Sequence, residues 1–458
     1  MSSGDGRDAR PLAVFRIAFA FTLLCEVLQL IRFRHLVFDD VPFIAPARFD
    51  IRLILGLWLL ILLALMGGVA TRIAAALNLL LTLAVFGILI RLRHFGYHAD
   101  TIYIPGAMLL ALIPSERTLS FDAWRARRAG KAPPAPVNAV CFAAFAVLLA
   151  ITYADSFLWK LSSPMWRHGL AIWTPVAEVF ACARIPPLPP IPWLWKGMSY
   201  GAMIFEVLFP MTIWFRRARI PLAVAGIAMH LGIAYLFPLP LFSMGMIALY
   251  LPLIPGKFYG AEESRSAAPA DAGSRAVSWL LGVWVIAALI LAMRVPPLAG
   301  SRIGGRAAVM TIRALSLLGV RSHDVYLDGH FTEPRPTMLV FEGRDGRIVL
   351  PYTSASGLTG PALYGRVYSN WIWTATMSGE AAAEGSRVIR RYAAFWLGER
   401  RLPVRVGRIV VYRRRVVYPH DVDASVLRAN QEARWEEAGE ISGLDPLLIR
   451  NALDATAR

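Results

Sequence analysis

Residues 51–92 read IRLILGLWLLILLALMGGVATRIAAALNLLLTLAVFGILIRL, two apolar runs that meet at a short turn containing Arg72. A bilayer core about 30 Å thick requires roughly 20 apolar residues in helical form. Each run has that length. The stretch therefore predicts a transmembrane helical hairpin with spans at 51–70 and 72–92.

Apolar runs of the same kind recur through the first 300 residues. We expect nine spans, at 11–31, 51–70, 72–92, 102–113, 137–158, 198–215, 220–237, 239–254 and 278–297. The run from Ile102 to Ile113 is short for a span. Counting it places the basic loops on one side of the membrane, as expected for cytoplasmic loops.

The composition supports a membrane protein and excludes a soluble enzyme, a fibre or a disordered chain. Of the 458 residues, 57% are hydrophobic and 17% are charged, whereas soluble domains carry about 25% charge. The net charge of +17 lies largely in short loops, where it orients the chain, so no nucleic-acid partner is expected. Cys25, Cys141 and Cys182 form no CxxC pair, and no metal site is indicated.

These patterns divide the chain into three parts. Residues 1–10 form a cytoplasmic tail, 11–298 a transmembrane bundle, and 299–458 an extracytoplasmic α+β domain. The predicted fold class is thus a membrane all-α bundle of about nine transmembrane helices with a small C-terminal extramembrane α+β domain. The expected location is a bacterial inner membrane.

The polar C-terminal part shows local signals of its own. Thr337 to Tyr352 has the pattern of a β-hairpin with a glycine-containing turn, and Arg405 to Tyr418 contains a second strand pattern. Residues 386–398 and 422–438 are predicted helices. In the bundle part, the proline-rich stretch 185–195 is expected to be an irregular interfacial segment, because proline lacks the amide donor of a regular helix.

Two ionisable residues fall inside neighbouring spans. Glu206 and His230 are predicted at matched depths, so they could share a hydrogen bond. An ionisable group within a span is costly and often functional. The alternative is a structural polar contact between helices, and the sequence leaves both open. Arg16 is expected to extend towards the membrane surface. Glu26 lies nearer the outer end of the same span, so its position says less about a function.

Lys160 and His98 are both predicted at the outer leaflet. Lys160 lies in FLWKLSSPMWRHG (157–169), and His98 lies in GYHAD (96–100). An amine in such an apolar, aromatic setting becomes uncharged more readily and can act as a general base. A lysine that merely reaches the membrane surface from a helix end is the alternative.

At these residues the chain resembles HTTM-domain proteins, the membrane relatives of vitamin K-dependent gamma-carboxylase. Lys160-Leu-Ser-Ser-Pro-Met-Trp166, followed by Gly169, is similar to the K-L-x-x-P-x-W-x-x-G signature of that family. Further matching elements occur in order: Phe15-Arg16, His98, Ser120-Phe-Asp122, Glu206 with Pro210, and His230 before Phe237-Pro238. The resemblance covers roughly residues 10–255.

The resemblance implies a mechanism. In the carboxylase a lysine amine deprotonates reduced vitamin K, which reacts with oxygen and becomes an epoxide. The strong base so formed removes a γ-proton from a glutamate, and carbon dioxide adds. The catalytic lysine falls on Lys160 and the supporting histidine on His98. The implied pocket residues are Trp159, Trp166, Glu206 and His230, and the implied cofactor is reduced vitamin K or menaquinone.

Two departures argue against glutamate carboxylation. Trp159 replaces a second lysine of the carboxylase, and the spacing to Trp166 is one residue longer. Binding or oxygenation of a lipophilic quinol stays open. The chief alternative is a non-enzymatic scaffold or lipid-binding component whose outer domain engages a polypeptide partner. A proton-coupled transporter using Glu206 and His230 would require inverted repeats, which the sequence lacks.

Overall fold

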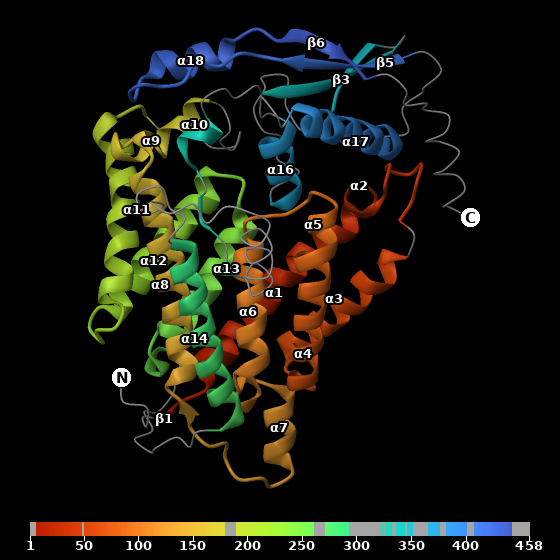
Figure 1. The fold of residues 1–458 in the computed structure, drawn as a ribbon. Coiled ribbons are helices and arrows are strands. Elements are labelled where there is room, and N and C mark those ends of the chain that lie inside the picture. Colours follow the sequence, from red (N-terminus) through yellow and green to blue (C-terminus); the bar gives the residue numbers. More distant parts are fainter. Residues whose placement is uncertain are drawn as a thin grey trace.

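Helices form a bundle that carries a small β-sheet at one end, here called the sheet end (Figure 1). A computed structural model describes residues 6–47, 50–178, 189–260, 271–292, 320, 322–324, 326–331, 336–343, 346–350, 365–375, 382–400 and 407–441. The N-terminal strand and α7 (Phe121–Arg128) lie at the opposite end of the bundle.

The long helices coincide with the expected apolar runs. They are α1 (Arg10–Arg32), α3 (Ile51–Gly67), α4 (Thr71–Thr82), α6 (Asp100–Leu112), α8 (Val140–Leu161), α11 (Pro192–Thr212), α12 (Arg219–Leu236), α13 (Pro240–Tyr250) and α14 (Ala272–Ala292). A π-helix (Leu83–Leu89) and α5 (Ile90–Leu92) continue α4. Shorter helices in the bundle part are α2 (Arg34–Phe38), α9 (Pro164–Arg167) and α10 (Trp173–Ala177), with 3-10 turns at Ser115–Arg117, Leu251–Leu253 and Gly256–Tyr259.

Length and hydropathy identify the helices able to cross a bilayer. Within the described residues, five qualify fully: Arg10–Arg32, Thr71–Leu92, Val140–Leu161, Arg219–Leu236 and Ala272–Ile290. Ile51–Gly67, Asp100–Leu112 and Pro240–Leu253 are apolar but shorter. The count of nine crossings therefore stays a prediction.

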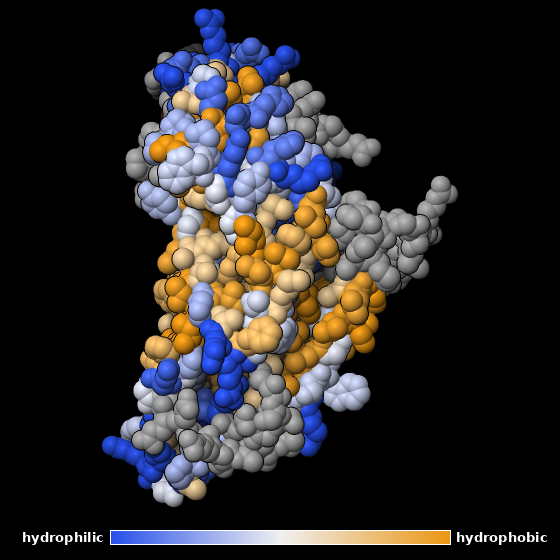
Figure 2. Space-filling view, turned by 90° about the vertical axis from the view of Figure 1, so that its left-hand side faces the viewer, coloured by the Kyte–Doolittle hydropathy of each residue, from blue (hydrophilic) through white to orange (hydrophobic). Residues whose placement is uncertain are grey.

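On the face shown in Figure 2, an apolar belt lies between two hydrophilic ends. Large apolar side chains are also exposed on individual helices, among them Leu53, Leu57 and Leu60 on α3 and Trp279, Ile286 and Leu289 on α14. An apolar surface of this extent is unfavourable in water and favourable in lipid. The belt marks an integral membrane protein.

The sheet contains four antiparallel strands in the order β4-β3-β5-β6. Its strands are β3 (Thr337–Gly343), β4 (Gly346–Val349), β5 (Gly407–Arg413) and β6 (Glu436–Glu440), and the helices near it are α16 (Arg366–Asn370), α17 (Ala382–Arg400) and α18 (Ala424–Glu432). A π-helix (Trp371–Ala375) continues α16, a 3-10 turn spans Asp328–His330, and β1 (Gly6–Arg7) pairs with β2 (Val137–Asn138) at the other end. Strands β3 and β4 form the predicted hairpin, β5 lies within the second strand pattern, and the predicted helix at 386–398 lies within α17.

Two local predictions were wrong. The helix expected at 422–438 ends at Glu432, and residues 436–440 instead form β6, because they pair with β5 and their acidic side chains meet Arg408. The stretch 185–195 is helical from Pro192 onwards. Proline is accepted at the first helical position because its missing amide donor is not required there. Residues 185–188 lie outside the described residues.

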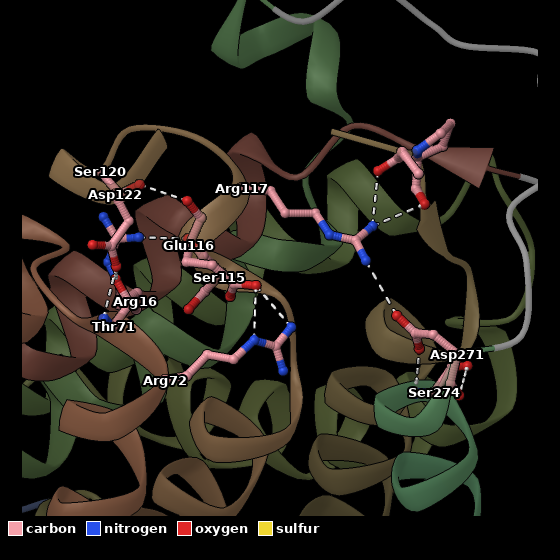
Figure 3. A network of polar contacts seen from close by, with 12 residues as sticks. Arg16, Thr71, Arg72, Ser115, Glu116, Arg117, Ser120, Asp122, Asp271 and Ser274 are labelled. Carbon is pink, nitrogen blue, oxygen red and sulfur yellow. Dashed lines mark hydrogen bonds and ion pairs between the residues drawn. The ribbon is translucent and has the colours of Figure 1, made fainter. Parts of the chain in front are cut away.

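Arg16 does not extend towards water. It is fully buried, and its guanidinium donates to the backbone carbonyl oxygens of Ser115 and Leu119 in the loop that follows α6 (Figure 3). Asp122 secures the same end of the bundle, because it accepts hydrogen bonds from the backbone amide and the hydroxyl of Thr71, each at 2.8 Å. These side chains therefore join separate helices and loops at this end of the bundle.

Gly68 marks the closest approach in this network. Its φ is +69°, and a Cβ atom there would lie 2.3 Å from Cβ of Ser120. We expect Gly68→Ala to lower the free energy of unfolding by about 2 kcal/mol or more, through backbone strain and overpacking. Gly56→Ala is the matched control, because that glycine lies within α3 with open space around it. Thermal unfolding of the purified protein in detergent measures both. Equal unfolding temperatures for the two variants would contradict the close approach of Gly68 to Ser120.

Candidate functional site

A cavity of about 500 Å³ lies between the helices towards the sheet end. Its walls are mostly apolar and come from α8, α11, α12 and α13, with Phe205, Met229, Ile233 and Phe242 among them. Small-molecule sites commonly enclose about 300–1,000 Å³ and combine apolar walls with a few polar groups. The volume and the lining therefore suit a lipophilic ligand of moderate size.

Lys160 and Glu206 form a buried ion pair in the cavity wall. Lys160 Nζ contacts Glu206 Oε1, to which Ser156 Oγ also donates at 3.2 Å. The side chains are almost inaccessible, with residue exposures of 7% for Lys160 and 4% for Glu206. Glu206 Oε2 has no hydrogen-bond partner among the described residues. One carboxylate oxygen is therefore paired with the amine, while the other stays available to a ligand.

The lysine motif folds so that an aromatic ring meets the amine. Helix α8 ends at Leu161, Pro164 opens the short helix α9, and Gly169 ends that turn with φ +72°. As a result the ring centroid of Trp166 lies 4.0 Å from Lys160 Nζ, a cation–π distance. The spacing of lysine, proline, tryptophan and glycine in the motif thus places the aromatic ring against the amine.

His230 lines the same cavity but does not bond to Glu206. Its Nε2 lies 2.9 Å from the hydroxyl of Tyr153, which also contacts the hydroxyl of Tyr250. The predicted hydrogen bond between Glu206 and His230 is wrong, because α8 supplies a partner to each: Lys160 to the carboxylate and Tyr153 to the imidazole. His230 Nδ1 has no partner in the described part of the chain.

The remaining predicted site residues fall into two groups: those that line the cavity and one that does not. His98 precedes α6 and lines the cavity together with Lys160, Trp166, Glu206 and His230. Trp159 is half-buried and does not belong to the described cavity lining. Successive helical residues point about 100° apart, so the face of α8 that presents Lys160 turns Trp159 away. Its assignment to a ligand pocket stays a prediction that the described lining does not include.

The C-terminal region forms part of the cavity wall, which the sequence did not reveal. His323, Tyr326, Ser369 and Trp373 all line it. Trp166 Nε1 donates to the carbonyl oxygen of Tyr326 at 2.7 Å, so the family motif is joined directly to this region. Burial raises the pKa of the Tyr326 phenol, which therefore stays neutral.

Asp328 makes a second connection between the C-terminal region and the motif. The backbone amide of Met165 donates to its Oδ1 at 2.8 Å, and the hydroxyl of Ser163 contacts its Oδ2. Both partners lie in the turn between α8 and α9. The segment around Tyr326 and Asp328 is therefore held over the lysine motif by side-chain and backbone contacts.

A third connection is a fully buried arginine. Arg366 of α16 donates to Glu26 Oε1 at 2.7 Å and to both oxygens of Asp100, at 3.1 and 2.6 Å. All three side chains have no exposed area. Glu26 thus has a clear role that its position alone did not indicate: it pairs with a residue 340 positions away.

The belt, the helical bundle and the enclosed polar groups define an integral membrane protein with an internal ligand-sized cavity. The HTTM-domain family model matches residues 5–255, more than half of the chain, so the chain belongs to the HTTM family and to the carboxylase-like class of membrane proteins. No curated protein and no solved structure matches the chain. The matched region includes Lys160, His98, Glu206 and His230 but none of the C-terminal residues at the cavity.

Proposed function

We propose that the chain binds a lipophilic quinol, such as reduced menaquinone or vitamin K, and deprotonates it with Lys160 as the first step of an oxygenation. The observation that carries this proposal is the Lys160–Glu206 pair in the wall of an apolar cavity. Glutamate carboxylation is not proposed. The cavity fits the ligand class, since apolar walls suit a fused ring and Glu206 Oε2 can accept a hydrogen bond from one of its hydroxyls.

Lys160 acts as a base only when its amine is neutral. Glu206 Oε1 contacts this amine directly, so in the proposed mechanism the amine passes its proton to the carboxylate before it acts. The amine then accepts the quinol proton: the O–H bond breaks, an N–H bond forms, and a quinolate oxygen remains. The new ammonium is stabilised by the Trp166 ring face, and His98 assists from the cavity wall.

The proposed orientation places the sheet end outside the cytoplasm and the N-terminus inside, in a bacterial inner membrane. Its support is the distribution of basic residues, since cytoplasmic loops are enriched in them. The segments joining helices at the opposite end contain Arg125, Arg127, Arg128, Lys131, Arg216 and Arg217.

The test uses purified protein with reduced menaquinone and oxygen, and mass spectrometry of the quinone products. Lys160→Met should reduce epoxide formation by about 100-fold or more, because a positioned base contributes about 10²–10⁴ in rate. Lys196→Met is the matched control, since Lys196 pairs with Asp421 at the surface. The proposal fails if wild type forms no epoxide or if Lys160→Met forms as much as wild type.

The scaffold alternative makes a different prediction in cells. There, Lys160→Met would leave the function intact, whereas deletion of the residues after 300 would abolish it. Comparison of these two variants in a strain lacking the protein separates catalysis from partner binding.

A further inference from the structure

His323 is a buried histidine that the proposed chemistry does not yet use. It belongs to the C-terminal region, lies outside the family match at 5–255, and lines the cavity. It is 7% exposed. Neither ring nitrogen has a hydrogen-bond partner among the described residues. Asp155 faces Nδ1 as an ion-pair partner, so Nε2 is the ring nitrogen left for a ligand, and a buried polar atom without a hydrogen bond is costly.

Asp155 on α8 holds His323 in place. Its Oδ2 accepts from the backbone amide of His323 at 2.5 Å and lies 3.5 Å from the ring Nδ1. The ring is perpendicular to that of His98, with 5.0 Å between centroids. Two histidines, one from each part of the chain, therefore form a polar group at the cavity wall.

This histidine group is separate from the Lys160–Glu206 pair. Asp155 precedes Lys160 by five residues of α8, a rise of about 7 Å along the helix axis. Both groups line the same cavity, which therefore offers a ligand two polar regions. A ring with hydroxyls at its opposite ends, as in a 1,4-quinol, matches two such regions, whereas a ring with one hydroxyl matches only one.

We infer that His323 binds the quinol hydroxyl opposite the one that faces Lys160, so that the site selects a 1,4-dihydroxy ring over a monohydroxy ring. The inference rests on the proposed function and deepens it. It makes the C-terminal region a specificity-determining part of the ligand site, with Asp155 as a positioning residue for His323.

The experiment compares two probes on the full-length protein under argon: 1,4-dihydroxynaphthalene and 1-naphthol, which lacks only the second hydroxyl. Tryptophan quenching gives the two dissociation constants, and their ratio does not depend on the active fraction of the sample. We expect wild type to bind the diol about tenfold more tightly, the effect of one well-placed hydrogen bond. His323→Ala should bring the ratio close to one while 1-naphthol binding is kept.

Milder variants and a control variant show whether a change in the binding ratio comes from the loss of the His323 side chain or from misfolding. His323→Gln should retain part of the preference and Asp155→Asn should reduce it, whereas His420→Ala, at an exposed histidine of the same region, should leave it unchanged. The inference is overturned if wild type binds both probes equally or if His323→Ala keeps the wild-type ratio. Failure of wild type to bind either probe overturns the proposed quinol site as well, which distinguishes the two failures.

Discussion

Arg366→Met is expected to lower the free energy of unfolding by about 3–5 kcal/mol, because it leaves Glu26 and Asp100 buried without their cation. The guanidinium also donates to the carbonyl oxygen of Phe95 at 3.1 Å and lies 4.6 Å from the ring centroid of Phe86. Methionine retains much of the apolar volume, so the loss is mainly one of charge and hydrogen bonds.

The measurement is thermal unfolding in detergent combined with limited proteolysis of the C-terminal region. Arg408→Met serves as the control, because Arg408 makes its ion pairs on the exposed surface of the sheet, where such pairs add little. Arg366→Met should unfold at a lower temperature and release C-terminal fragments early. If it behaves like Arg408→Met, the buried ion pairs do not hold this region to the bundle.

Glu206→Gln is expected to lose both turnover and stability, whereas a double variant should recover only stability. The single change leaves Lys160 buried beside a cavity without its carboxylate, at a cost of about 3 kcal/mol. Lys160→Met with Glu206→Gln removes both charges, so its stability should return to within about 1 kcal/mol of wild type. Epoxide formation should stay absent, because no base remains.

A double-mutant cycle measures this coupling. Lys196 and Asp421 provide the matched control cycle, because their ion pair lies at the surface and should show little coupling. Additive losses at Lys160 and Glu206 would mean that the two residues act independently, and the proton-sharing role of Glu206 would be wrong.

The apolar runs predicted the helices well because burial in lipid imposes a local requirement: about 20 apolar residues in succession. The lysine motif was equally local. Its proline and glycine lie within nine residues of Lys160, and together they place Trp166 against the amine. Such features can be recognised without knowing what the rest of the chain does.

The C-terminal contribution could not be predicted in this way. His323 contacts Asp155, which lies 168 residues earlier in the chain. Arg366 contacts Glu26 and Asp100, which lie 340 and 266 residues earlier. A local pattern in the sequence does not indicate which distant segments will meet. Residues 436–440 show the same limitation, since pairing with β5 overrides their local preference. The available signal was a set of ionisable residues in otherwise apolar surroundings, and it identified candidates but not partners.

The distance in sequence between Arg366 and its carboxylates also has a consequence for biosynthesis. Glu26 leaves the ribosome 340 residues before its cation, an interval of roughly 20–70 s at ordinary rates of translation. For most of that time, once Asp100 has also been made, the newly inserted helices hold two acidic side chains with no countercharge from α16. A nascent chain stalled before residue 366 should therefore be a favoured substrate for membrane quality-control proteases, and completion of the polypeptide should end that vulnerability.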